Sequence, residues 1–127
     1  GERILVFGEC VGDPCGNIIE EAVNPYAFII LENEIRDTAK ETFGYFASQG
    51  VDIVVISGDN PVTASKVAVR AGINNAENYI DATTLKSRQD IREAITKYTV
   101  FGRVVPSQKK EIIEAYKESG KVVAMMC

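Results

Sequence analysis

The sequence predicts an α/β domain with a mainly parallel, Rossmann-like sheet. From residue 26 onward, short runs rich in β-branched residues alternate with longer segments whose apolar residues recur at helical spacing. Proline and glycine stand where those helices are expected to begin and end. One run, Val51–Ile56, is almost wholly apolar, which is typical of a strand covered on both faces of a parallel sheet. The connections between such strands are expected to be right-handed crossovers.

The N-terminal segment predicts two strands joined by a turn-rich piece. Arg3–Phe7 and Tyr26–Leu31 are rich in strand-forming residues. Between them, Gly12–Pro14 and Gly16–Asn17 carry residues that favour turns.

A helix is expected after this segment. Its apolar face is formed by four residues at helical spacing, and Gly50 provides the left-handed residue that commonly ends a helix. The four apolar residues are Ile35, Ala39, Phe43 and Phe46. The strand 51–56 follows, interrupted only by Asp52.

The middle of the chain predicts two helices separated by a short strand. Pro61 suits the first position of a helix that runs to about Ala71 and ends at Gly72, because the N–H that proline lacks has no partner there. Asn78–Asp81 predicts a short strand. Ser87–Lys97 predicts a helix that opens with a variant capping box.

The last part predicts a strand, a helix and a strand. Thr99–Phe101 is the first strand, and Pro106 again suits a first helical turn. Gly120 is placed to end that helix before the strand Lys121–Met125. The apolar face of the helix consists of Ile112, Ile113, Ala115 and Tyr116.

Composition restricts the class of protein. With 127 residues, 46% hydrophobic and 25% charged, the chain is expected to be globular. Its net charge of -4 disfavours a nucleic-acid partner. No apolar run approaches the roughly 18 residues of a membrane helix, and no signal peptide is evident, so we expect a soluble chain that is not exported. Cys10, Cys15 and Cys127 lack metal-site spacing and indicate a reducing compartment, so we assign no metal ligands.

The residues directly after the predicted strand 51–56 are the first candidate site, because ligands bind beyond the carboxyl ends of parallel strands. Ser57-Gly58-Asp59-Asn60 could bind phosphate through the serine hydroxyl and backbone N–H groups at a helix N-terminus. Alternatively, Gly58 permits a tight turn while Asp59 or Asn60 caps the helix. Both interpretations are open on these residues alone.

Lys109 is the second candidate, one turn into the helix that begins at Pro106. A lysine at this edge could neutralise phosphate charge near Ser57. It could equally be a solvated surface lysine, and charge alone does not distinguish it from Lys110.

Two ordered motifs resemble those of P-type ATPases, the ion pumps with a haloacid-dehalogenase-like phosphorylation domain. Val55–Ile73 resembles the T-G-D-N segment and its flanks, and Phe101–Lys109 resembles the F-A-R-V-x-P-x-x-K segment downstream of it. Lys121–Met125 resembles the strand that leads into T-G-D-G-x-N-D in these pumps. The resemblance covers most of the chain from Leu31 and extends more weakly to Gly1.

The resemblance assigns roles to particular residues. It implies that Ser57 binds phosphate and Lys109 neutralises its charge, both acting in catalysis, while Gly58 and Asp59 help hold the nucleotide and the phosphoryl group. Arg36 matches the arginine of a D-P-P-R stretch near bound ATP, although Asn33 stands where an aspartate is usual.

Arg3 resembles an arginine near the interdomain hinge that contacts ATP phosphates, and a plain surface arginine is the alternative. The resemblance further implies that residues 1–30 end a nucleotide-binding domain and that 31–127 form an incomplete phosphorylation domain.

The implied parent is a P-type ATPase that couples ATP hydrolysis, through an aspartyl phosphate, to cation transport. ATP and Mg²⁺ are its expected cofactors, and its other domains and transmembrane helices are the expected partners. The flanking residues resemble bacterial pumps of the calcium or magnesium type, so Ca²⁺ or Mg²⁺ is the expected transported cation. The family resemblance implies that this part of the parent lies on the cytoplasmic side of a membrane.

Two of the family's motifs do not occur in this sequence. D-K-T-G-T, which carries the phosphorylated aspartate, and T-G-D-G-x-N-D, which holds Mg²⁺, are both missing. The isolated chain is therefore expected not to hydrolyse ATP. In the family, the D-K-T-G-T strand lies between the strands ending at Ser57 and near Met125. Without it these two strands cannot pair in the native way, and their unsatisfied edges are expected to favour non-native pairing or self-association.

Two alternatives remain open. A soluble phosphatase of the haloacid-dehalogenase superfamily needs a D-x-D nucleophile before Ser57, which the sequence does not offer. A non-catalytic, receiver-like regulatory module needs clustered acidic residues at strand ends, where only Asp59 clearly lies.

Overall fold

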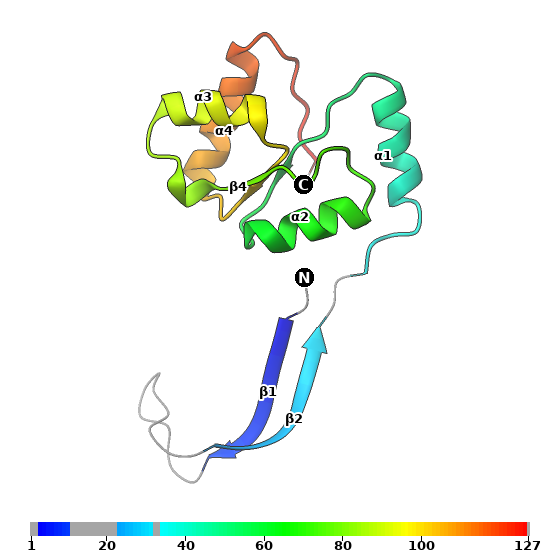
Figure 1. Ribbon diagram of the computed structural model, residues 1–127, viewed down its shortest axis with the longest axis vertical. Helices are drawn as coiled ribbons and strands as arrows, with labels where there is room; N and C mark the ends of the chain where they lie inside the picture. The colour runs from blue at the N-terminus through cyan, green and yellow to red at the C-terminus, as the bar shows by residue number, and fades with distance from the viewer. Residues whose placement is uncertain (1–2, 11–22, 32–33, 127) are drawn as a thin grey trace. The chain divides into compact units, whose positions relative to one another are not determined.

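A computed structural model describes residues 3–10, 23–31 and 34–126, without the side chain of Arg3. The chain divides into two compact units, residues 1–34 and 35–127 (Figure 1). The predicted turns at 12–17, Cys15, Asn33 and Cys127 lie outside the described residues. The assignment of the first unit to a nucleotide-binding domain remains a prediction.

The first unit is an antiparallel hairpin of β1 (Arg3–Cys10) and β2 (Val23–Leu31). Both strands are longer than predicted, and Arg3 pairs with Leu31 at one end of the ladder. An irregularity falls between Phe7 and Gly8. There the hairpin requires glycine, because a Cβ on Gly8 would lie 2.6 Å from the carbonyl oxygen of Asn24.

The second unit confirms the predicted α/β class. Its sheet is parallel, with the order β3-β5-β4. The central strand β5 aligns Val100 with Val55 of β3 and Phe101 with Ile80 of β4. In chain order, the elements are α1 (Ala39–Ser48), β3 (Val55–Ile56), α2 (Pro61–Arg70), β4 (Tyr79–Asp81), the 3₁₀ turn η1 (Ala82–Thr84), α3 (Arg88–Lys97), β5 (Val100–Gly102) and α4 (Pro106–Glu118).

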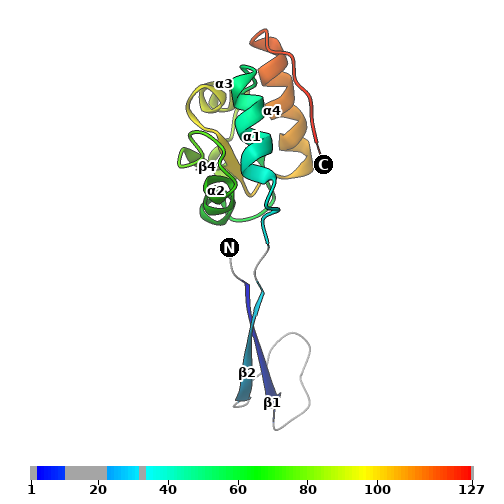
Figure 2. The same ribbon diagram turned by 90° about the vertical axis from the view of Figure 1, so that its right-hand side faces the viewer.

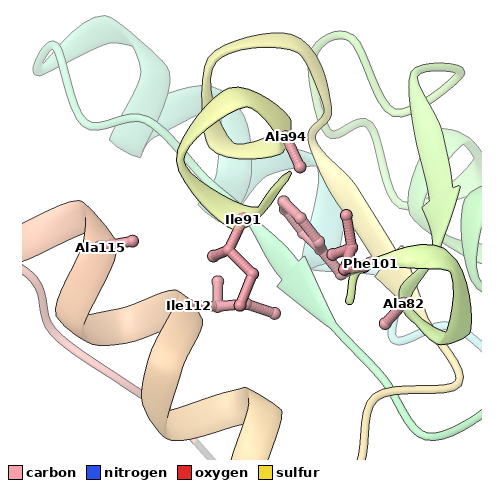
Figure 3. Close-up of a cluster of buried hydrophobic side chains, with 7 residues drawn as sticks. Ala82, Ile91, Ala94, Phe101, Ile112 and Ala115 are labelled. Atoms are coloured by element: carbon pink, nitrogen blue, oxygen red, sulfur yellow. The ribbon is translucent and has the colours of Figure 1, made fainter. Parts of the chain in front are cut away.

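Helices cover both faces of this sheet. Successive side chains of a strand point to opposite faces, so Val100 packs toward α2 with Ala64 and Ala68, while Phe101 packs toward α3 and α4. Figure 3 shows Phe101 among Ile91 and Ile112 of those two helices. Val100, Phe101 and Ile112 are fully buried, so β5 is the centre of the core.

The helix boundaries follow the predicted signals closely. Asn60 caps α2 by accepting a 2.9 Å hydrogen bond from the N–H of Val62, and Gly72 follows the helix with a φ of 84°. Gly50 and Gly120, with φ values of 72° and 85°, lie just beyond α1 and α4. The capping residue predicted ambiguously as Asp59 or Asn60 is therefore Asn60.

The predicted amphipathic face of α1 is also present. Among the described residues between 31 and 50, the half-buried ones are the four predicted apolar positions: Ile35, Ala39, Phe43 and Phe46. None of the helix residues is fully buried. The helix therefore turns the expected face inward while contributing little to the core.

One strand prediction is correct only in part, and another is wrong. The strand predicted over 51–56 is confined to Val55–Ile56, because its short neighbour β5 supplies a ladder only there and on one side. Residues 121–125 form no strand, and Val122 is fully exposed. Instead the segment runs back along α4 (Figure 2), with Lys121 Nζ 2.5 Å from Asp52 Oδ2. Without a neighbouring strand, its apolar residues have no ladder to join.

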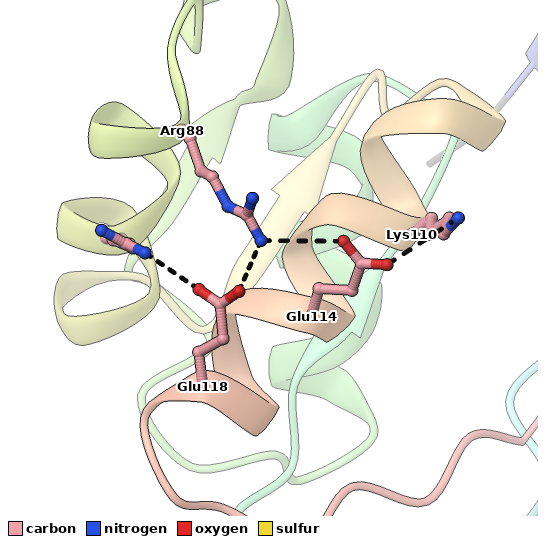
Figure 4. A network of polar contacts seen from close by, with 5 residues as sticks. Arg88, Lys110, Glu114 and Glu118 are labelled. Atoms are coloured by element: carbon pink, nitrogen blue, oxygen red, sulfur yellow. Dashed lines mark hydrogen bonds and ion pairs between the residues drawn. The ribbon is translucent and has the colours of Figure 1, made fainter.

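Charged side chains join α3 and α4 on their exposed side (Figure 4). Arg88 and Arg92 lie 2.5 and 3.0 Å from the Glu118 carboxylate. The Arg92 hydrogen bond and the nearby Arg88 charge hold the pKa of Glu118 below its usual range. These groups are well exposed, so we assign them an orienting role rather than a large contribution to stability.

The capping box of α3 gives a first stability prediction. The Ser87 Oγ accepts from the N–H of Asp90 at 3.1 Å, and Asp90 accepts in return from the N–H of Ser87 at 2.8 Å. Ser87→Ala should lower the free energy of unfolding by about 1 kcal/mol. Urea unfolding followed by circular dichroism measures this, and an unchanged midpoint would show that the box contributes nothing.

Candidate functional site

Three loops meet at the carboxyl edge of the parallel sheet. Ser57 directly follows β3, Arg103 directly follows β5, and Asp81 is the last residue of β4. This edge is where parallel α/β sheets bind ligands.

A pocket of about 320 Å³ opens at this edge. It brings together Ser57, Gly58 and Lys109, three residues singled out from the sequence. Its full lining is Ile56, Ser57, Gly58, Val104, Val105, Pro106 and Lys109.

Backbone hydrogen bonds fix the two sides of the pocket against each other. The N–H of Val104 donates to the Ser57 carbonyl at 3.0 Å, and the N–H of Arg103 donates to the Asp59 carbonyl at 2.7 Å. The N–H of Ser57 donates to the Phe101 carbonyl at 2.9 Å and extends the ladder between β3 and β5. The loop after β3 is therefore held by the loop after β5.

The Ser57 hydroxyl is oriented by its own turn. Its Oγ accepts a 3.1 Å hydrogen bond from the N–H of Asp59, which leaves the hydroxyl proton available for donation. Ser57 is half-buried at the pocket wall, a few residues before the positive end of α2. A phosphate oxygen is a suitable acceptor for such a donor.

Gly58 is not required by the backbone of this turn. Its φ lies outside the left-handed range, and the nearest atom to an added Cβ would be the Val104 carbonyl oxygen, 3.8 Å away. The alternative that Gly58 serves a tight turn is therefore not supported. What the glycine does provide is an open pocket wall without a side chain.

The structure distinguishes Lys109 from Lys110, which charge alone did not. Lys109 is half-buried and lines the pocket, and it forms no ion pair within the described residues. Lys110 is exposed and approaches Glu114 at 3.8 Å. The ammonium group of Lys109 is therefore the one placed to meet an anion in the pocket.

The remaining predicted residues lie outside the pocket lining. Asp59 is exposed and contributes its carbonyl to the loop contact described above. Arg36 is exposed just before α1. Arg3 begins β1 in the other unit.

Sequence reasoning missed a group of polar residues beside the pocket. Arg103 Nη1 lies 2.9 Å from Asp81 Oδ2, and Gln108 Nε2 donates to the Ala82 carbonyl at 2.8 Å. The pattern Asp81-x-Thr83 is a recognisable side-chain turn, and it was the available signal. Nothing in the sequence indicates that Arg103 adopts a φ of 53°.

These contacts predict a pH dependence. The hydrogen bonds from Thr83, followed by the Arg103 charge, hold the pKa of Asp81 below its usual range. The stabilisation is present above the ordinary aspartate pKa and is lost as the pH falls through the lower folded value. The stability difference between the chain and Asp81→Asn should therefore shrink between about pH 7 and about pH 3 in urea unfolding. A difference that is constant with pH would contradict this assignment.

The described residues do not supply a metal site by themselves. No group of three or more Asp, Glu, Cys or His side chains among them is arranged to hold a metal ion. The pocket lining contains no carboxylate, so the residues present fit an anion better than Mg²⁺. In the part of the chain that the structure describes, no helix has the length and apolar character needed to cross a membrane.

Comparison with known proteins gives independent evidence on the family of this chain. Residues 9–126 match the family model of haloacid dehalogenase-like hydrolases. The calcium-transporting ATPase CtpE of Mycobacterium bovis is 42% identical over 104 residues, covering 81% of this chain and 13% of that protein. CtpE of Mycolicibacterium smegmatis is 36% identical over 126 residues, covering 98% of this chain and 16% of that protein.

A third relative is the probable cation-transporting ATPase exp7 of Streptococcus pneumoniae, 37% identical over 103 residues, covering 81% of this chain and 13% of that protein. The chain thus spans about one-seventh of the length of the curated relatives it matches. It belongs to the haloacid dehalogenase-like hydrolase family, and its relatives include cation-transporting ATPases.

Proposed function

We propose that this chain is the phosphate-binding part of the catalytic region of a P-type ATPase that couples ATP hydrolysis to cation transport. The observation that carries the proposal is the meeting of Ser57, Gly58 and Lys109 in one pocket at the carboxyl edge of the sheet. The similarity to calcium- and cation-transporting ATPases supports the same conclusion.

The pocket residues have complementary tasks toward a phosphoryl group. The Ser57 hydroxyl donates a hydrogen bond to a phosphate oxygen, and the Lys109 ammonium group neutralises the charge that develops on the phosphoryl oxygens. Gly58 leaves room for the phosphate to approach the backbone. Catalysis of phosphoryl transfer depends on such positioning and charge stabilisation. Asp59, Arg36 and Arg3 would contact the nucleotide in the parent protein.

ATP and Mg²⁺ are the proposed cofactors of the parent protein. Bound Mg²⁺ would supply charge neutralisation at the transferred phosphoryl group. Its carboxylate ligands and the aspartyl nucleophile would come from motifs that this sequence lacks. The 127-residue chain alone is therefore proposed not to hydrolyse ATP, and a hydroxylamine-labile phosphate on it would refute that.

The proposed setting is the cytoplasmic side of a membrane, with the transmembrane helices of the parent as partners. Ca²⁺ or Mg²⁺ is the proposed cargo, because relatives are named calcium-transporting and magnesium-transporting ATPases.

The nucleotide sequence on both sides of the coding segment tests the parent function. The proposal expects D-K-T-G-T upstream, G-D-G-x-N-D downstream and membrane helices in the same reading frame. Stop codons without these motifs would contradict transport and favour a soluble phosphatase or a free-standing module.

Gly58→Ala tests the pocket. An added Cβ has room in the fold, so the free energy of unfolding should change by less than about 1 kcal/mol. The methyl group should nevertheless obstruct phosphate, weakening its affinity about tenfold, because it occupies the open wall. Titration with inorganic phosphate followed by NMR measures the affinity. Unchanged affinity with an intact fold would show that phosphate does not approach Gly58.

A further inference from the structure

Arg103 has an unusual backbone conformation for its residue type. Its φ of 53° lies in the left-handed region, which side chains with a Cβ rarely adopt. Such a conformation persists only when surrounding contacts hold it in place. The contacts of Arg103 therefore indicate which parts of the structure hold this conformation.

Arg103 is held from both its backbone and its side chain. Its N–H donates to the Asp59 carbonyl at 2.7 Å, and its Nη1 lies 2.9 Å from Asp81 Oδ2. Asp81 is in turn fixed by Thr83, whose N–H and Oγ1 donate to Asp81 Oδ1 at 3.0 and 2.7 Å. The carboxylate is thus oriented before it meets the guanidinium group.

The residues that follow Arg103 form half of the phosphate pocket. Val104 donates to the Ser57 carbonyl and lines the pocket, and Lys109 lies one turn into the next helix. Gln108 forms a second contact with the segment that follows β4, through its hydrogen bond to the Ala82 carbonyl. A change in the conformation of Arg103 would therefore move Lys109 relative to Ser57.

We propose that the Arg103–Asp81 pair is a positioning device that holds the left-handed turn after β5 and thereby sets the spacing of Ser57 and Lys109 across the pocket. This inference rests on the proposed function of the pocket. The side chains are 53% and 24% exposed, so the ion pair itself adds little to global stability, and its main effect is expected on the local loop.

Three variants of the 127-residue chain separate the backbone conformation from the side chain. Asp81→Asn removes the charge but retains an oxygen that accepts from Thr83. Arg103→Ala removes the side chain and leaves the left-handed conformation unsupported. Arg103→Gly also removes the side chain, but glycine adopts this conformation without strain. Arg92→Ala is the matched control, because it removes an exposed arginine paired with Glu118 at 3.0 Å, away from the pocket lining.

Two quantities are measured by NMR: the rate of hydrogen exchange at the backbone amides of residues 103 and 104, and the affinity for inorganic phosphate. Asp81→Asn and Arg103→Ala should accelerate exchange and weaken phosphate binding about three- to tenfold, since the competent loop is populated less. Arg103→Gly and Arg92→Ala should stay close to the unmodified chain in both readouts.

The proposal is overturned if Asp81→Asn leaves both readouts unchanged, or if Arg103→Gly loses as much affinity as Arg103→Ala. The second result would assign the effect to the side chain itself. If the unmodified chain gives no response to phosphate, the proposed function of the pocket fails. Amide exchange in the same variants then decides whether the pair holds the loop.

Discussion

Gly102→Ala is expected to destabilise the second unit by about 3 kcal/mol or more. A Cβ on Gly102 would lie 2.3 Å from the Cα, 2.4 Å from the nitrogen and 2.6 Å from the Cβ of Pro61. These atoms belong to the first turn of α2 and to a rigid ring, so a rotamer change cannot relieve the overlap. Both residues are buried. The helix would have to move away from β5, the central strand of the sheet.

Urea unfolding followed by circular dichroism measures this effect. Gly44→Ala is the matched control, because Gly44 lies inside α1 and an added Cβ would meet no atom within 4 Å. That control should stabilise the chain by up to about 1 kcal/mol through helix propensity. A Gly102→Ala chain as stable as the unmodified one would contradict the close approach of α2 to β5.

In the parent ATPase proposed above, Lys109→Ala is expected to reduce phosphoryl transfer on the order of 10²- to 10³-fold. The reason is that Lys109 supplies the ammonium group of the pocket lining, which contains no carboxylate. Removing it leaves the charge of the transferred phosphoryl group without this counter-charge. The rate of phosphoenzyme formation from ATP measures the loss.

Lys110→Ala is the matched control for that experiment. Lys110 is the next residue of the same helix, but its side chain is exposed and lies toward Glu114 (Figure 4). Its removal should leave the rate of phosphoenzyme formation within about twofold of the rate of the unmodified protein, as for a surface substitution. Equal losses from both variants would show that the net charge of the helix matters rather than a lysine in the pocket.

Much of the fold was predictable because local signals and tertiary packing agree. Pro61, Pro106 and the Ser87 capping box mark helix starts that the structure confirms. The strands were harder to predict, because an apolar run becomes a strand only where another strand is available to pair with it. Val51–Ile56 and Lys121–Met125 have similar apolar character, yet only Val55–Ile56 finds a ladder.

The candidate site was predictable in part. Its position after β3 follows from parallel-sheet topology, and motif resemblance selected Ser57 and Lys109. The contribution of Arg103 and Asp81 was not predictable, because it depends on a left-handed backbone and on a pairing across 22 positions of sequence. Gly102 and Gly58 look alike in the sequence, and only their surroundings show that one is required by packing and the other lines a pocket.

The central claim is that Ser57, Gly58 and Lys109 form a phosphate site, and an NMR titration of the 127-residue chain with inorganic phosphate tests it most directly. We expect saturable shifts confined to the backbone amides of residues 57–60, 104, 105 and 107–109, and we expect Lys109→Ala to abolish them while Lys110→Ala preserves them. Shifts that are absent, spread over the chain or equally reduced by both lysine variants would contradict the site.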